Sequence, residues 1–307
     1  MRIVVAGANG LVGARVAGLL ASRGHDVLGL GRGPRRAVGV WAYATCDVAS
    51  ELELREALTP HRPELILNTA AMTEVDACEK DRRQAFAANV LAPAHLSRIA
   101  QEHGAHLVHV STDYVFDGDH GPYDEEALPN PRGVYATTKH MGEQTVRTLA
   151  PSWTIARTAV VYGWPATGRA NFGSWVVGSL AEGKEVRLFE DQFVSPSHAD
   201  NVAAMVAELG ERKLAGIWNV AGADTVNRIQ YARALCEVFG FDAKLLVPTR
   251  LAELKLASPR PLRSGLKPEK TLAALSAKPL SLTQSLQCFH QEYRASVAAT
   301  PGVTRST

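Results

Sequence analysis

The stretch VVAGANGLVGARV, residues 4–16, joins a short apolar run to a segment with helical periodicity. Its glycines, Gly7, Gly10 and Gly13, follow the spacing G-x-x-G-x-x-G. The first permits a tight turn, the second lets the backbone approach a phosphate, and the third lets the helix pack closely on the strand. The helix N-terminus would then face a pyrophosphate with free amides and its positive dipole end. At the first strand–helix junction this pattern predicts a dinucleotide site, although glycines alone also suit any sharp turn.

The same strand–helix alternation continues through the first half of the chain. Apolar runs without polar alternation suit strands covered on both faces, as in a parallel sheet. These runs occur at residues 26–32, 41–48, 65–70 and 106–112. The pattern predicts an α/β fold, a Rossmann-type doubly wound parallel sheet. Because the alternation weakens later, we expect a dinucleotide-binding domain at 1–157, with parts of 185–220 able to return to it. Residues 158–307 would form mainly a smaller C-terminal substrate-binding lobe.

Composition argues against several classes of protein. The net charge of +2 is spread evenly, which gives no electrostatic case for a nucleic-acid or membrane partner. The chain begins with a strand pattern rather than a signal peptide, and no run of about 18 apolar residues suggests a membrane span. Its four cysteines lie far apart and its ten histidines lack a convincing ligand spacing. We therefore expect no metal site, and reduced thiols in a cytoplasmic protein.

The end of the second apolar run indicates which dinucleotide binds. It reads Gly31-Arg32, without the carboxylate that bonds the ribose 2′-hydroxyl in NAD sites. Arg32 suits the additional 2′-phosphate of NADP, with Arg35 or Arg36 in support, although a solvated basic turn is the alternative. NADP(H) is therefore the preferred cofactor, with NAD(H) second. Asp47, after the third run, could meet the adenine edge or cap the next helix.

Tyr135 and Lys139 lie at positions i and i+4 of a helical pattern, hence on one face. A lysine ammonium near the phenol would lower its pKa from about 10 toward working pH. Tyr135 could then donate a proton to a carbonyl oxygen as hydride arrives. A hydroxyl of Ser111 or Thr112, at the end of an apolar run, could hydrogen-bond the same oxygen. The Tyr–Lys spacing alone is common by chance, but together with the glycine loop it indicates a reductase site.

These residues resemble the extended short-chain dehydrogenase/reductases over nearly the whole chain. The matching motifs, in the family's order, are GANGLVG (7–13), NTAA (68–71), AANV (87–90), STDYVFDG (111–118) and YATTK (135–139). More narrowly, residues 111–143 resemble the dTDP-4-dehydrorhamnose reductase group. DQF (191–193) and RPLRSGL (260–266) resemble it as well.

The resemblance implies reduction of the 4-keto group of a nucleotide-linked 6-deoxysugar with NADPH or NADH. It implies that Thr112 positions the carbonyl, that Tyr135 is the acid, and that Lys139 tunes it and bonds the nicotinamide ribose. The implied cofactor contacts are Gly7, Asn9, Gly10, Leu11, Val12, Gly13, Arg32, Asp47, Val48, Ala70, Ala71, Asn89, Tyr135 and Lys139. The implied substrate contacts are Asp113, Tyr114, Val160 and Arg263.

Two departures from the group concern the substrate. Val160 stands where the group often has a tryptophan that packs on the sugar. Arg263 replaces an asparagine of the late motif, and it could meet a phosphate or lie on the surface.

Two alternative functions stay open. One is a nucleotide-sugar epimerase that keeps its cofactor bound. The other is a non-catalytic NADP-binding regulatory protein similar to the methionine adenosyltransferase regulatory subunit. Dehydration is less favoured because no Glu follows Asp113. The expected partner is a nucleotide-diphosphate sugar, and a homodimer is an open alternative to a monomer.

Overall fold

The computed structural model describes residues 1–36, 39–165 and 170–298. Seven strands form one parallel sheet in the order β11-β6-β5-β4-β1-β2-β3. They are β1 Arg2–Ala6, β2 Asp26–Gly31, β3 Ala42–Thr45, β4 Leu65–Asn68, β5 His106–Thr112, β6 Trp153–Thr158 and β11 Gly216–Asn219. The strand order reverses between β1 and β4, as in a doubly wound Rossmann sheet. This architecture confirms the fold class predicted from the sequence.

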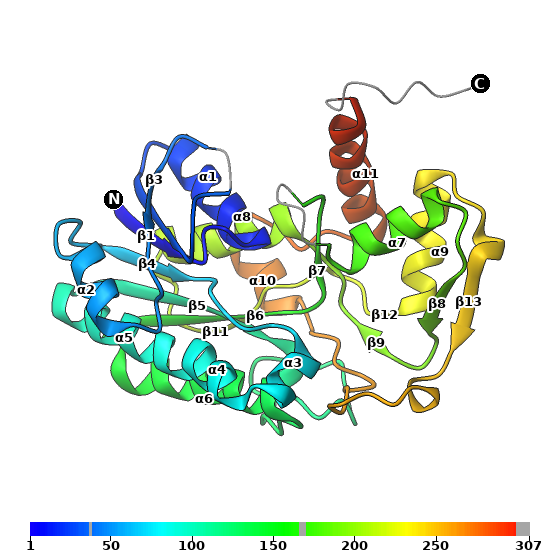
Figure 1. The fold of residues 1–307 in the computed structure, drawn as a ribbon, viewed down its shortest axis with the longest axis horizontal. Helices are drawn as coiled ribbons and strands as arrows, with labels where there is room; N and C mark the ends of the chain where they lie inside the picture. The colour runs from blue at the N-terminus through cyan, green and yellow to red at the C-terminus, as the bar shows by residue number, and fades with distance from the viewer. Residues whose placement is uncertain (37–38, 166–169, 299–307) are drawn as a thin grey trace.

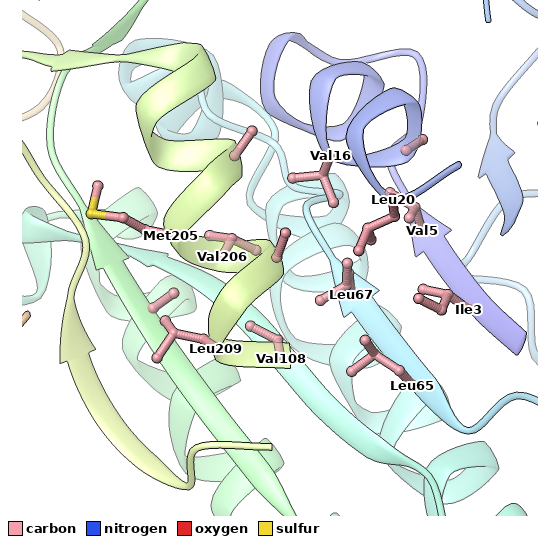
Figure 2. Packing of buried hydrophobic residues seen from close by; sticks show 14 of the residues in the cluster. Ile3, Val5, Val16, Leu20, Leu65, Leu67, Val108, Met205, Val206 and Leu209 are labelled. Atoms are coloured by element: carbon pink, nitrogen blue, oxygen red, sulfur yellow. The ribbon is translucent and has the colours of Figure 1, made fainter. Parts of the chain in front are cut away.

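Helices cover both faces of the sheet (Figure 1). α1 (Leu11–Ser22) and α8 (Ala199–Glu211) lie on one face, and α2 (Glu51–Leu58), α5 (Ala92–His103) and α6 (Val134–Leu149) on the other. Figure 2 shows the buried packing on the first face, where side chains of β1, β4 and β5 meet those of α1 and α8. The labelled residues are Ile3, Val5, Val16, Leu20, Leu65, Leu67, Val108, Met205, Val206 and Leu209. Alternate strand residues enter each core, which explains the continuous apolar runs.

A second hydrophobic core lies in the C-terminal half, beyond one end of the sheet (Figure 1). It is formed by α7, α9, α11 and the parallel pair β8–β13. Two further strand pairs, β7–β10 and β9–β12, come from the same half of the chain. The bounds are α7 Phe172–Ala181, α9 Arg228–Phe239, α11 Leu282–Ala298, β7 Val161–Tyr162, β8 Val186–Phe189, β9 Phe193–Val194, β10 Ser197–His198, β12 Val226–Asn227 and β13 Leu246–Thr249.

Part of this half packs with the main sheet: α8, β11 and the short α10 (Glu269–Ala274). The domain boundary at residue 157 stays a prediction. Among the described residues, no helix is long and apolar enough to cross a membrane.

The segment before β5, which the sequence suggests is one helical stretch, is divided. It contains α3 (Val75–Lys80), α4 (Arg82–Phe86), a π-helical turn η1 (Ala87–Leu91) and α5. Asp81 leaves the helical region with φ −126° and ψ 77°, and its side chain accepts a hydrogen bond from Gln84 N at 2.9 Å. It therefore ends one helix and caps the next. The π turn carries Asn89, and such turns are frequent at functional sites.

Candidate active site

The carboxyl ends of the parallel strands bring the predicted residues to one edge of the sheet. The glycine loop follows β1, Arg32 follows β2, and Thr112 ends β5. The turns after β3, β4 and β6 carry Asp47 with Val48, Ala70 with Ala71, and Val160. Ligands of open parallel sheets bind at this edge, beside the point where the strand order reverses.

The glycine loop has the shape that a pyrophosphate requires. Gly7 has a φ of +84°, which favours glycine. A Cβ at Gly7 would lie 2.7 Å from Ala70 N, and a Cβ at Gly13 only 2.2 Å from the Gly7 carbonyl oxygen. Gly10 is the N-cap of α1, so no side chain caps the helix, and its first turn holds no acidic residue. The amides of that turn can therefore bind phosphate, and the loop fits a dinucleotide.

Gly13→Ala is expected to weaken NADPH binding at least about tenfold and to destabilise the fold by about 1–3 kcal/mol, because α1 must move away from β1. The matched control is Gly18→Ala on the same helix, where a Cβ would meet nothing within 4 Å. That control is expected to stabilise the protein by about 0.5–1 kcal/mol and to bind NADPH normally. Thermal unfolding and fluorescence titration measure both effects. Normal NADPH affinity in Gly13→Ala would remove the role assigned to the glycine loop.

Asn9 organises the turn after β2. Its Oδ1 accepts a hydrogen bond from Arg36 N at 2.8 Å, which ties that turn to the glycine loop. Arg32 is exposed on the same turn. Arg35, by contrast, lies over the Trp41 ring at 4.1 Å and donates to the Trp41 carbonyl oxygen at 2.9 Å. Arg32 and Arg36 therefore reach solvent without being stacked on Trp41, and Arg32 is the one that directly follows β2.

One of the two alternatives for Asp47 is wrong. Ser50, not Asp47, is the N-cap of α2, and its side chain accepts from Glu53 N at 3.4 Å. Asp47 instead accepts a hydrogen bond from Ala49 N at 3.0 Å. Contact between Asp47 and the adenine edge stays a prediction, as does that of the buried Val48.

Thr112 and Tyr135 bring two hydroxyl groups together at the end of β5. The Tyr135 phenol lies close enough to the Thr112 hydroxyl for that hydroxyl to lower the pKa of the phenol, and Thr112 donates to Asp113 Oδ1 at 3.1 Å. Ser111, the alternative in the sequence, lies one residue earlier on the strand and faces Glu143 instead. Of the two neighbouring hydroxyls, Thr112 is therefore the one placed to share a carbonyl oxygen with Tyr135.

The expectation that the pKa of Tyr135 falls toward working pH is wrong for this structure, because burial has the larger effect on it. Burial raises the pKa of Tyr135 above its ordinary value, against a smaller opposite effect from Thr112. Lys139 Nζ donates to the Val110 carbonyl oxygen at 2.7 Å and so points toward β5. Burial lowers the pKa of Lys139 itself to about 8, with Glu143 opposing. A phenol that keeps its proton is the form that a general acid needs.

The side chain of His109 contacts that of Lys139. Its Nε2 is 3.5 Å from Lys139 Nζ, and its Nδ1 is 3.0 Å from Asn68 Nδ2. Since Asn68 Oδ1 accepts from Ala70 N at 3.1 Å, the Asn68 amide turns its NH₂ toward the imidazole. Burial lowers the pKa of His109 well below its usual value, so the ring is neutral and its proton lies on Nε2, facing the lysine.

A buried ion pair anchors α6 to β6. Arg157 Nε and Nη2 donate to the two carboxylate oxygens of Glu143 at 3.0 and 2.8 Å. The side chains are 2% and 1% exposed. Tyr135, Lys139 and Glu143 are spaced by four residues and share one helical face. The ion pair therefore fixes the catalytic face of α6 against the sheet.

Glu143→Gln is expected to lower the free energy of unfolding by about 3–5 kcal/mol, because Arg157 is left buried without a counter-charge. Burial raises the pKa of Glu143, but the nearby His140 and the hydrogen bonds from Arg157 outweigh it and bring the value to about 2. The stabilisation is therefore present above the ordinary carboxyl pKa of 4.5 and lost as pH falls toward about 2. Urea unfolding at several pH values measures it.

The matched control for that experiment is Glu190→Gln. Glu190 pairs with Arg250 at 3.2 Å, but the side chains are 44% and 70% exposed. Its loss is expected to cost less than about 1 kcal/mol. Equal costs for the two variants would contradict an anchoring role for Glu143.

Asn89 connects the turn after β4 to α6. Its Oδ1 accepts from Met72 N at 2.9 Å, and its Nδ2 donates to the Met72 carbonyl oxygen and to Thr138 Oγ1, both at 3.1 Å. These bonds use both the oxygen and the nitrogen of the Asn89 side-chain amide. Asn89 therefore links the turn after β4 to α6. Its contact with a cofactor stays a prediction.

Asp113 is buried beside the hydroxyl pair and is bound by a residue that sequence reasoning missed. Ser264 Oγ donates to Asp113 Oδ2 at 2.5 Å. Burial raises the pKa of Asp113 to about 6 although the bonds from Ser264 and Thr112 oppose this. The signal was present, since Ser264 belongs to the RPLRSGL motif. Tyr114, the next residue, lies edge-on to Tyr135 with ring centroids 5.7 Å apart.

The two residues that depart from the reductase pattern differ in their placement. Val160 is partly exposed and has a φ of +40°, a left-handed conformation that β-branched residues avoid. Its carbonyl oxygen accepts from Ser197 N at 3.2 Å, which holds this strained turn. Arg263 lies with its side chain exposed, while its backbone N donates to the Gly118 carbonyl oxygen at 3.0 Å.

A cluster of potential metal ligands forms where α1, α8 and α11 meet, although the sequence indicates no such pairing. His198, Asp200 and Glu292 place one ligand atom each within 4.8 Å of the others. The Arg15 guanidinium lies among them, with Nε 2.6 Å from Asp200 and Nη2 2.9 Å from Glu292. Arg15 therefore supplies the positive charge that pairs with both carboxylates.

A dinucleotide loop facing a Thr–Tyr–Lys set defines the class as an extended short-chain dehydrogenase/reductase. Sequence comparison makes this more specific. The chain belongs to the RmlD substrate binding domain family, whose sequence model matches residues 1–295. This membership confirms the resemblance predicted from the motifs.

Known proteins of this kind cover most of the chain. A probable low-salt glycan biosynthesis reductase of Haloferax volcanii is 35% identical over 269 residues, 87% of this chain and 89% of the relative. A dTDP-4-dehydrorhamnose reductase of Mycobacterium tuberculosis is 34% identical over 272 residues, 86% and 84% of the two chains. The crystal structure of a dTDP-4-dehydrorhamnose reductase of Bacillus anthracis in complex with NADP gives a TM-score of 0.84 at 26% identity. It covers 94% of this chain and 98% of that one.

Proposed function

We propose that the chain is an NADPH-dependent reductase of the 4-keto group of a nucleotide-activated 6-deoxysugar. The observation that carries the proposal is the buried Thr112–Tyr135 hydroxyl pair at the same sheet edge as the glycine loop. The dTDP-4-dehydrorhamnose reductases among its relatives support the choice of substrate class. The expected partner is therefore a nucleotide-diphosphate sugar.

Each candidate residue has a separate role in the proposed reaction. Gly7, Gly10 and Gly13 would hold the pyrophosphate of the cofactor, and the bound nicotinamide supplies the hydride. Thr112 orients the carbonyl oxygen of the substrate, and Tyr135 donates its proton to that oxygen as negative charge develops there. Lys139, held by the Val110 carbonyl oxygen, supplies a positive charge one helical turn after Tyr135. That charge favours the phenolate left after proton transfer.

Arg32→Ala is expected to weaken NADPH binding about tenfold while leaving NADH affinity nearly unchanged. The reason is that the exposed guanidinium at the end of β2 would bind only the 2′-phosphate, through charge-assisted hydrogen bonds. Titration of wild type and variant with both cofactors measures the ratio, and NADH is the internal control. An equal change for both cofactors would remove the 2′-phosphate argument.

The direct test of the function is to mix the purified protein with NADPH and a panel of nucleotide-linked 4-keto-6-deoxysugars. Loss of absorbance at the nicotinamide band with formation of the 4-hydroxy sugar is the expected result. Isomerised sugar without net NADPH consumption would favour the epimerase. A flat absorbance while NADPH still binds would favour the regulatory protein.

We also propose the cytoplasm as the location. The four cysteines are free thiols, and three of them, Cys46, Cys78 and Cys236, are buried. Free thiols persist in a reducing compartment. The homodimer stays a prediction.

A further inference from the structure

Arg228 is a half-buried cation that the reaction outlined above does not use. It is the first residue of α9, and its guanidinium lies 4.4 Å over the Phe172 ring. Its Nε donates to Gln192 Oε1 at 3.1 Å. Its Nη1 is shut off from solvent and makes no hydrogen bond to any of the described residues. One edge of the guanidinium is therefore bound, and another is unsatisfied.

The position of Arg228 is unfavourable for a positive charge. Within the described ranges no carboxylate forms an ion pair with it, and burying an unpaired cation costs free energy. The N-terminal end of a helix is the positive end of its dipole, which disfavours a cation there. The backbone at that end is already satisfied by the Asn227–Gln230 capping box. A bound anion would offset all of these costs.

The surroundings place Arg228 on the substrate side of the site. Tyr114, Asp113 and Tyr231 are the titratable groups close to it. Asp113 directly follows the catalytic Thr112, but its oxygens are taken by Thr112 and Ser264. Gln192, the partner of Arg228, donates to the Pro261 carbonyl oxygen at 3.2 Å and so joins this group to the late RPLRSGL segment.

We propose that Arg228 binds an anionic oxygen of the substrate and selects substrates that carry such a group beside the keto sugar. The proposal rests on the function proposed above. The anion has two sources, the diphosphate of the nucleotide sugar or a carboxylate on the sugar ring. Both offer a guanidinium the same oxygen acceptors, so the chemistry of the contact is shared.

The test is Arg228→Met, which keeps an apolar stem beside Phe172 and removes the charge. Binding of dTDP and of UDP-glucuronate is measured by calorimetry, with NADPH affinity and thermal unfolding as checks of folding. Loss of a buried charge-assisted contact is expected to weaken binding about 10- to 100-fold. A loss for both probes identifies the diphosphate as the source, and a loss for UDP-glucuronate alone identifies the carboxylate. Arg187→Met, on the exposed side of β8, is the matched control and should bind like wild type.

Unchanged affinity of Arg228→Met for both probes overturns the proposal, as does a wild-type protein that binds neither. Should the Met variant fail to fold, Arg228→Lys carries the test. It retains a point charge without the planar fork and is expected to bind about 3- to 10-fold more weakly, whereas wild-type affinity contradicts the proposal. These assays need no turnover. A protein that binds dTDP through Arg228 but reduces no keto sugar would sink the proposed reductase function alone.

Discussion

Tyr135→Phe is expected to lower kcat about 10²- to 10⁴-fold and to keep NADPH affinity within about twofold of wild type. The variant removes one oxygen atom, the proton donor that lies close to the Thr112 hydroxyl. The ring itself should keep its place, because it is 8% exposed and packs edge-on against Tyr114. Steady-state rates and cofactor titration on the same preparation separate loss of chemistry from loss of binding.

The control for this experiment is Tyr293→Phe, a phenol of α11 that packs in the second hydrophobic core. Its rate should match wild type. Full activity of Tyr135→Phe would remove Tyr135 as the acid. Because burial raises the pKa of Tyr135 and lowers that of Lys139 to about 8, a fall in wild-type kcat near pH 8 would report loss of the lysine charge and not of the phenol proton.

Lys139→Met is expected to reduce kcat about 100-fold or more and, at neutral pH, to raise thermal stability. The catalytic loss follows from removing the positive charge that favours the phenolate after proton transfer. The gain in stability follows because the lysine is 2% exposed and has no carboxylate in direct contact among the described residues. A residue that costs stability and supports activity is typical of a catalytic group.

The sign of the pH dependence follows from the lowered pKa. Burial brings the pKa of Lys139 from 10.5 to about 8, so above about 8 the unfolded chain binds more protons than the folded one. Wild-type stability from this group therefore rises as pH rises from about 8 toward 10.5. The advantage of Lys139→Met should shrink across the same window. An advantage that does not vary with pH would contradict the buried, titrating lysine.

The fold and the meeting of the candidate catalytic residues at one edge of the sheet were predictable because their signals are local. The glycine spacing at Gly7–Gly13 lies within one turn, and the apolar runs reflect strands buried on both faces. Tyr135 and Lys139 share a helical face by spacing alone. The NADP preference likewise rests on one position, Arg32, at the end of a strand.

Side-chain contacts between residues far apart in the sequence were not predictable. Ser264 reaches Asp113 across 151 positions, and Arg15 joins Glu292 across 277. The direction of Lys139 depends on which carbonyl of β5 lies beside α6, and neither spacing nor composition specifies that. Arg228 lacked any motif, and only its unsatisfied Nη1 beside the candidate substrate residues makes it a candidate. The division of the helical stretch before β5 followed from Asp81 leaving the helical region, which its sequence position alone did not indicate.

Hydride transfer to a 4-keto sugar beside Tyr135 is tested most directly with NADPH that carries deuterium at the transferable C4 position. After reaction with a dTDP-linked 4-keto-6-deoxysugar, the product is analysed by mass spectrometry and proton NMR. We expect one deuterium on C4 of a 4-hydroxy sugar, formed in equal amount to the NADPH consumed, and at least about 100-fold slower formation of that product with Tyr135→Phe. A sugar product without deuterium at C4, or its formation at the wild-type rate by the Phe variant, would contradict the proposed reaction.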